Sequence, residues 1–125
     1  MPTMSTVTTQ AGDGVGVVVH LDEDTSGKFE AVLRNVGHLL DELDDHSPVE
    51  LVAHGPGVAV MLRSNPHSGT VQDLRDRGLL LVACGNTMAR MDIAPQELTQ
   101  GVSVASSGLG QLVRRQRQGW SYVRP

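Results

Sequence analysis

Apolar residues occur along this chain in short blocks separated by polar loops, and the blocks are of two kinds. Some are continuous runs rich in valine and leucine, the pattern of strands buried on both faces of a sheet. These strands are predicted over residues 14–21, 49–54, 79–83, 102–105 and 120–123. Other blocks repeat every three or four residues, which is typical of amphipathic helices. These helices are predicted over residues 28–43, 70–77 and 109–118, with one helical turn at 94–98.

Two segments are less clear from their pattern. Residues 58–63 fit either a strand or a buried helix, and we favour a short helix because a glycine-rich loop after a strand usually opens one. Val58–Leu62 is also more apolar than a short surface helix needs, so we expect part of it to face another subunit. Residues 85–91 are predicted as a loop or a short helix.

The alternation of strands and helices predicts an α/β fold, a three-layer α/β/α sandwich around a five-stranded, mostly parallel sheet. We expect residues 14–125 to form a single domain and residues 1–13, rich in Thr, Ser and Gln, to form a flexible tail. Right-handed crossovers place the carboxyl ends of all parallel strands at one edge of the sheet. Ligands and chemistry gather at that edge in such folds.

Three chemically capable side chains end the predicted strands. His20 and His54 end two valine-rich runs, and Cys84, which is the only cysteine, follows the third. We therefore expect one thiol and two imidazoles to share one edge of the sheet, together with Ser106 after the fourth strand. For Ser106 and Ser107 we favour helix capping over a nucleophilic role, because no Gly-x-Ser-x-Gly motif surrounds them.

Composition excludes several classes of protein. Three aromatic residues and a net charge of −4 argue against binding of nucleic acid. A lone cysteine cannot form an internal disulfide, and neither a membrane span nor a signal peptide is evident, so we expect a cytoplasmic protein. Acidic residues crowd the first half, whereas arginines mark the C-terminal end. Solvated helix faces explain this asymmetry most simply, and pairing between subunits is the alternative.

Four segments resemble the DsrE/DsrF-like proteins, specifically their small single-domain branch. They are Val17–Asp22, Glu50–Gly57, Ala83–Met88 and Gln118–Pro125. The resemblance covers residue 14 to residue 125 and implies a sandwich around a five-stranded parallel sheet, assembled as a trimer or hexamer. It further implies a sulfur relay in which a cysteine carries sulfane sulfur as a persulfide between donor and acceptor proteins. The cysteine after the third strand is carried over onto Cys84.

Attack on sulfur requires a thiolate, so the pKa of Cys84 must fall from about 8.5. A helix N-terminus or a nearby imidazolium would lower it, and His20 and His54 are the candidates for that supporting role. A buried Cys84 without reactivity toward thiol reagents would count against the hypothesis. Zinc binding by these three residues is the weaker alternative, because no local ligand spacing supports it. We therefore assign no metal and no cofactor.

The loops after the second and third strands complete the predicted pocket. Gly55 and Gly57 flank a proline, and a tight turn is a simpler interpretation than an anion cradle because no P-loop lysine follows. Asn86 and Thr87 are candidates for hydrogen bonds to a persulfide or, more simply, for helix capping. Whether the chain is an enzyme, such as a sulfurtransferase, stays open. The alternative function is a non-catalytic oligomeric module that binds a small ligand or a protein.

Overall fold

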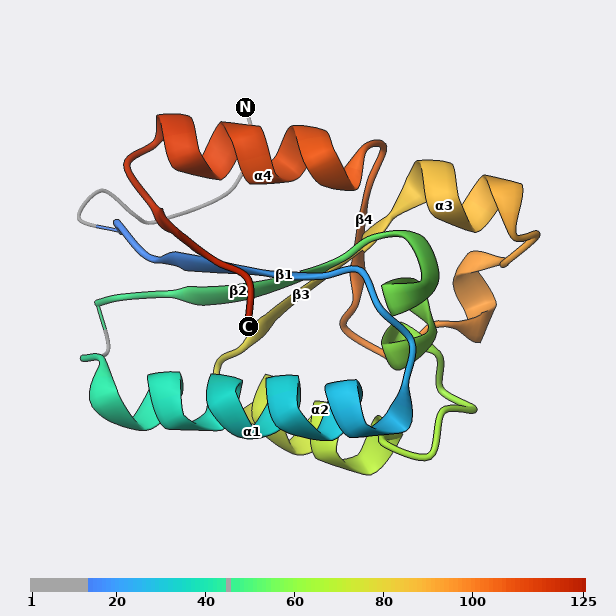
Figure 1. Ribbon diagram of the computed structural model, residues 1–125, viewed down its shortest axis with the longest axis horizontal. Helices are drawn as coiled ribbons and strands as arrows, with labels where there is room; N and C mark the ends of the chain where they lie inside the picture. The colour runs from blue at the N-terminus through green and yellow to red at the C-terminus, as the bar shows by residue number, and fades with distance from the viewer. Residues whose placement is uncertain (1–13, 45) are drawn as a thin grey trace.

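Five parallel strands form one sheet in the order β4-β3-β2-β1-β5 (Figure 1). They are β1 (Val17–Leu21), β2 (Val49–Ala53), β3 (Leu80–Cys84), β4 (Ser103–Ala105) and β5 (Ser121–Val123). The computed structural model describes residues 14–44 and 46–125, so the tail predicted over residues 1–13 lies outside the described residues. The predicted α/β fold around a five-stranded parallel sheet is confirmed.

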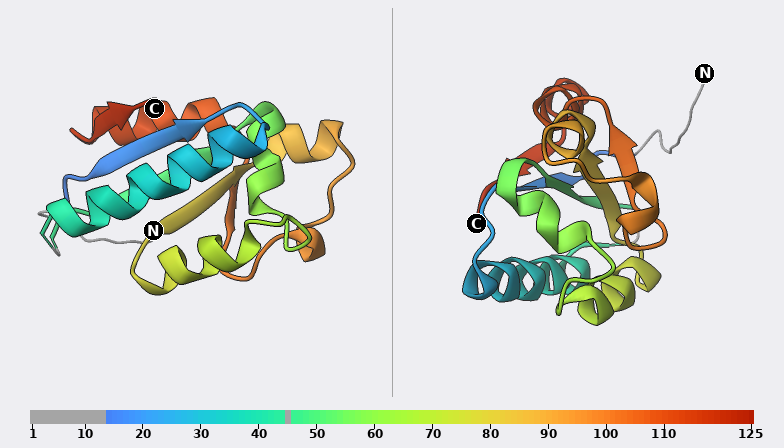
Figure 2. Two further views of the ribbon diagram at one scale, coloured as in Figure 1. Left: turned by 60° about the horizontal axis from the view of Figure 1, so that its bottom comes forward. Right: turned by 90° about the vertical axis from the view of Figure 1, so that its right-hand side faces the viewer.

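Helices cover both faces of the sheet, as Figures 1 and 2 show. On one face lie α1 (Ser26–Glu42) and α2 (Ser68–Asp76), and on the other lies α4 (Gly108–Arg117). We call these the α1/α2 face and the α4 face. The remaining elements lie beyond the carboxyl ends of the central strands (Figure 1). They are α3 (Gly85–Arg90) and two 3₁₀ helices, η1 (Gly55–Met61) and η2 (Pro95–Glu97).

The longest helix follows directly from the apolar stripe of its sequence. Phe29, Val32 and Val36 are all buried against the α1/α2 face, as the helical spacing predicted. The helix begins two residues before its predicted start, because the Thr25 hydroxyl oxygen accepts a hydrogen bond from the Lys28 N–H at 3.1 Å. Such a cap satisfies one of the backbone donors that a helix start leaves free.

Most of the apolar segment 58–62 belongs to the chain's own core. A short helix is present there, although it starts earlier, at Gly55. Val58, Val60 and Met61 are fully buried within the single chain. Their apolar character therefore reflects packing under the strand ends, and a contact of the partly buried Ala59 and Leu62 with another subunit stays a prediction.

Two of the C-terminal arginines pair with acidic residues from the first half of the same chain. Arg115 contacts the carboxylate of Glu50 through two nitrogens, at 2.7 and 3.1 Å, and Arg124 contacts Asp22 at 3.0 Å. The Arg115 guanidinium also lies 4.1 Å from the centre of the Trp120 ring, a cation–π distance. Arg115 and Arg124 therefore form ion pairs within the chain, an arrangement that the sequence analysis did not consider.

Within residues 14–44 and 46–125, no helix combines the length and the apolar character that crossing a membrane requires.

Candidate functional site

The three predicted strand-end residues lie on the α4 face of adjacent strands. Cys84 is the last residue of β3, and His54 follows β2 in the same register, because Ala53 pairs with Ala83. His20 of β1 pairs with Val52, two residues earlier. Side chains alternate between the faces along a strand. Val52 and Val82 pack on the α4 face, so His54 and Cys84, each two residues further along, point to that face as well.

Cys84 occupies the junction between two helix starts. It is the N-cap of α3, and its sulfur accepts the Thr87 N–H at 3.5 Å. The same sulfur accepts the N–H of Gly108, the first residue of α4, at 3.2 Å. These N–H groups carry the positive end of the helix dipole, so they favour a negatively charged sulfur.

The electrostatic surroundings lower the pKa of the Cys84 thiol. Burial alone raises it, because a thiolate loses its hydration inside the protein. Hydrogen bonds from the Thr87 side chain and from the backbone N–H groups of Thr87, Gly108 and Asn86 outweigh burial. We predicted that a helix N-terminus would lower the pKa of Cys84. In the structure the N-termini of two helices, α3 and α4, donate hydrogen bonds to its sulfur.

Gly108 leaves no space for a side chain beside the thiol. A Cβ at this position would lie 3.0 Å from the Cβ of Cys84, and 3.4 Å from both Cys84 Sγ and His54 Cβ. The α4 backbone therefore lies directly on the sulfur, and the Cβ of His54 lies close to the same residue of α4. Ser107 is the N-cap of α4, as predicted, because its hydroxyl oxygen accepts the Gly110 N–H at 3.0 Å. The contact between Gly108 and the thiol was not predicted.

Tyr122 is a site residue that the sequence analysis missed. Its hydroxyl lies 2.8 Å from Nδ1 of His20, from the neighbouring strand β5. His20 is 6% exposed, and its ring centre lies 5.7 Å from that of His54. Burial lowers the pKa of His20, with His54 and Arg124 acting in the same direction and Asp22 opposing them. The only sequence signal was the aromatic residue in the last predicted strand.

The loops after β2 and β3, which carry the remaining predicted pocket residues, are held by backbone conformation and hydrogen bonds. Gly55 adopts a φ of +57°, which favours glycine, and a Cβ at Gly57 would lie 2.3 Å from the Leu21 carbonyl oxygen. The Gly55 N–H donates to the Thr87 hydroxyl at 2.9 Å, so it supports a tight turn and is not free for an anion. The Asn86 side chain is exposed, and its backbone N–H donates to Ser106 at 3.0 Å, which joins α3 to the end of β4.

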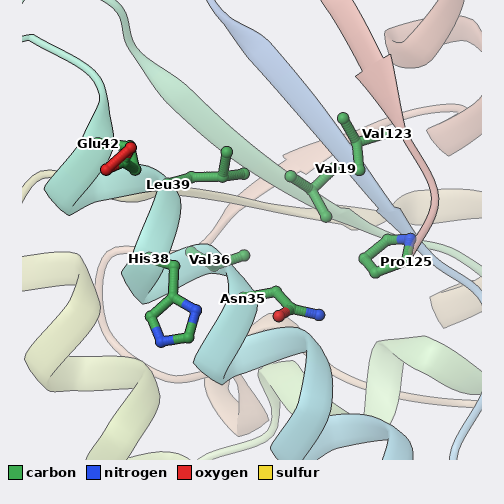
Figure 3. A pocket seen from close by; sticks show the side chains of 8 residues that line it. All are labelled: Val19, Asn35, Val36, His38, Leu39, Glu42, Val123 and Pro125. Atoms are coloured by element: carbon green, nitrogen blue, oxygen red, sulfur yellow. The ribbon is translucent and has the colours of Figure 1, made fainter.

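Two further observations bear on ligands. Among the described residues, no group of three or more His, Cys, Asp or Glu side chains is arranged to hold a metal ion, so the geometry gives the zinc alternative no support. A hollow of about 270 Å³ lies between α1 and the β1–β5 edge, lined by Val19, Leu39 and Val123 among others (Figure 3). It opens on the α1/α2 face, opposite the face that carries Cys84.

The thiol itself is buried. Cys84 is 2% exposed, covered by the first residue of α4. A Cys84 that is both buried and unreactive would count against the sulfur-relay hypothesis, and the structure shows that it is buried. The lowered pKa of Cys84, in contrast, favours a reactive thiolate. Access of a reagent to this sulfur therefore requires the chain that covers it, including the start of α4, to shift.

Comparison with known proteins places this geometry in a family. The model of the DsrE/DsrF-like family matches residues 21–125. No curated protein matches the chain.

Several solved structures share the fold. A protein of unknown function from Methanobacterium thermoautotrophicum, MTH1491, is 39% identical and superposes with a TM-score of 0.85, covering 89% of this chain and 99% of its own. The YchN protein from E. coli is 15% identical with a TM-score of 0.76, covering 89% and 99%. A conserved protein of unknown function from Bacteroides thetaiotaomicron, BT1422, is 12% identical with a TM-score of 0.72, covering 88% and 94%. The last two comparisons establish the fold alone.

Proposed function

Because the chain belongs to the DsrE/DsrF-like family, we propose that it is a cytoplasmic sulfur-relay protein that carries sulfane sulfur as a persulfide on Cys84. The observation that carries this proposal is the arrangement around the sulfur. The N–H groups of Thr87 and Gly108, at the starts of α3 and α4, point at Cys84 Sγ and lower the pKa of the chain's only thiol.

The transfer step needs no oxidant. The Cys84 thiolate attacks the outer sulfur of a donor persulfide, R–S–SH, and a new bond forms between Cys84 Sγ and that sulfur. The bond between the two donor sulfurs breaks, and the donor leaves as a thiolate that takes up the proton lost by Cys84. Because sulfane sulfur only changes its carrier, a second transfer by the same chemistry delivers it to an acceptor protein.

Intact-protein mass spectrometry after exposure to a low-molecular-weight persulfide donor tests the proposal. We expect a gain of one sulfur atom that a reductant removes and that Cys84→Ser does not acquire. Cys84→Ser is the matched control, because it keeps a small side chain at the cap position of α3. A folded wild-type sample that gains no sulfur would contradict the proposal.

One observation favours a second candidate, the non-catalytic binding module. The thiol is 2% exposed and accepts hydrogen bonds from two N–H groups, as a packing residue would. In that case Cys84→Ser unfolds at a different denaturant concentration from the wild type, and neither protein reacts with persulfide or with a small alkylating reagent.

We also propose that the protein is a homo-oligomer of three or six subunits. Support comes from large apolar side chains that stay exposed in the single chain. Those on or beside α4 and the β3–β4 edge are Leu80, Val104, Leu109 and Val113. Light scattering at micromolar concentration measures the mass directly, and a monomer would overturn this part of the proposal.

A further inference from the structure

Four polar or reactive side chains cross the α4 face in sequence, from the β5 edge to β3. Tyr122 of β5 is level with Val18 of β1, and His20 lies two residues further along β1. His54, just after β2, lies two residues beyond the partner of His20 and is level with Cys84 of β3. Side chains two residues further along on the neighbouring strand, as His54 is from His20, are within reach of each other when they are long or aromatic.

The hydrogen bond between Tyr122 and His20 constrains which way the His20 ring faces. The Tyr122 hydroxyl lies 2.8 Å from Nδ1 of His20. The hydrogen-bonding directions of the two nitrogens of an imidazole ring point away from each other. Nε2 of His20 therefore lies on the side of the ring away from the Tyr122 hydroxyl, and the centre of the His54 ring is 5.7 Å from that of His20.

One nitrogen on each of the two neighbouring rings is buried and has no partner among the described residues. Among the described residues, His20 Nε2 and His54 Nδ1 are buried side-chain atoms that have no hydrogen-bond partner. Leaving such a group unpaired inside a protein is unfavourable, because it has lost its hydrogen bonds to water. If one of these two nitrogens carries a proton and the other a lone pair, a small rotation of either ring would let them form a hydrogen bond with each other.

We propose that Tyr122, His20 and His54 form a directed hydrogen-bond chain in which His54 serves as the base for Cys84. In this chain His54 Nδ1–H donates to His20 Nε2, and His20 Nδ1–H donates to the Tyr122 oxygen. His54 Nε2 then keeps its lone pair. His20 and Tyr122 are positioning residues that set this tautomer, because the hydrogen bond at one ring nitrogen decides the protonation of the other. The inference rests on the proposed sulfur relay and extends it.

In this hydrogen-bond chain His54 carries the proton that is transferred during the reaction. His54 Nε2 takes the proton from the Cys84 thiol, and the thiolate attacks the outer sulfur of the donor persulfide. When the bond between the donor sulfurs breaks, the departing thiolate takes the proton from His54. At the end of the step Cys84 carries the persulfide, the donor is a thiol and His54 is neutral again.

The surroundings of His20 are consistent with its role as an acceptor. His20 Nε2 can accept a hydrogen bond from His54 only while the His20 ring is neutral, and burial lowers the pKa of His20. The charged and titratable groups that face it are Asp22, Arg124, His54 and Tyr122. Asp22 and Arg124 form an ion pair at 3.0 Å, so their opposing effects on His20 partly cancel.

Long-range hydrogen–nitrogen NMR correlation on isotope-labelled full-length protein tests the chain, because it separates protonated ring nitrogens from those with a lone pair. We expect protonated Nδ1 in both His20 and His54, with lone pairs on both Nε2 atoms. Tyr122→Phe keeps the ring and removes the acceptor, so His20 should change to a mixture of tautomers. The matched control His38→Gln removes an exposed histidine on α1 and should leave both patterns unchanged. A protonated Nε2 on His20 or His54 in the wild type would overturn the inference.

A second measurement separates this inference from the proposed function. The pH profile of Cys84 alkylation should shift upward in His54→Gln and less in Tyr122→Phe, with no further shift when the two are combined. If the wild type gains sulfur but keeps the opposite tautomers, the chain is wrong and the sulfur relay stands. If the tautomers and the alkylation shifts are as expected but no sulfur is gained, the sulfur relay is wrong and the hydrogen-bond chain stands.

Discussion

The α1/α2 face of the sheet is covered by two helices and carries most of the buried apolar side chains, whereas the α4 face is covered by one helix. Among the described residues, its buried apolar cluster consists of Val18, Val52, Val82, Leu112 and Trp120. Glu50, His20, His54 and Cys84 also lie on the α4 face. The α1/α2 face thus buries more apolar side chains, whereas the α4 face also holds an ion pair, two imidazoles and a thiol.

Shortening a core side chain on the α1/α2 face should have the largest effect on stability and none on the thiol. Leu51 is fully buried in the central strand β2. Leu51→Ala should lower the free energy of unfolding by about 2–5 kcal/mol, because it removes apolar contacts and leaves a cavity. Urea unfolding measures the loss. The alkylation rate of Cys84 in the folded protein should stay at the wild-type value, and a changed rate would show that the two faces are coupled.

A methyl group at Gly108 should have a smaller effect on stability but a direct effect on the thiol. Gly108→Ala brings a Cβ to 3.0 Å from the Cys84 side chain, and overpacking of this kind costs about 1–3 kcal/mol. Moving α4 away also weakens the hydrogen bond from the Gly108 N–H to Sγ, so the pKa of Cys84 should rise. Gly69→Ala in α2, where a Cβ meets nothing within 4 Å, is the matched control. Equal Cys84 titration curves for Gly108→Ala and the wild type would contradict the described contact.

The smallest expected effect is a pH dependence that the α4 face alone confers. The pKa of His20 is lowered from 6.5 by burial, so below that pH the unfolded chain binds more protons than the folded one. Stability contributed by the neutral ring is therefore lost as the pH falls through 6.5. Unfolding measured between about pH 5 and pH 7 should show a shallower acid loss in His20→Gln. Identical slopes would mean that His20 titrates alike in both states.

The helices and strands were predictable because their signals are local. The spacing of Phe29, Val32 and Val36 identified α1, and the valine-rich runs identified β1 and β2. At Val58–Leu62 the sequence showed how apolar the segment is but not what covers it. Only the packing of η1 beneath the strand ends, with Val60 and Met61 in the core, explains that composition.

The candidate site was only partly predictable, for a topological reason. Parallel strands place their carboxyl ends at one edge, so Cys84, His20 and His54 were expected to meet there. The contact between Tyr122 and His20 depends on β5 lying beside β1, and residues 102 positions apart carry no local signal of that order. The Gly108 contact likewise depends on how α4 lies across the sheet, which the periodicity of its sequence does not give.

Both edges of the sheet, as described, are formed by strands of three residues, β4 and β5. An edge strand offers its unpaired backbone N–H and C=O groups as a template on which another chain can add a strand, and long edges are prone to aggregation. Edges this short offer few such groups. Copies of this protein should therefore meet through side chains, and concentrated solutions should resist the β-type aggregation that longer open edges promote.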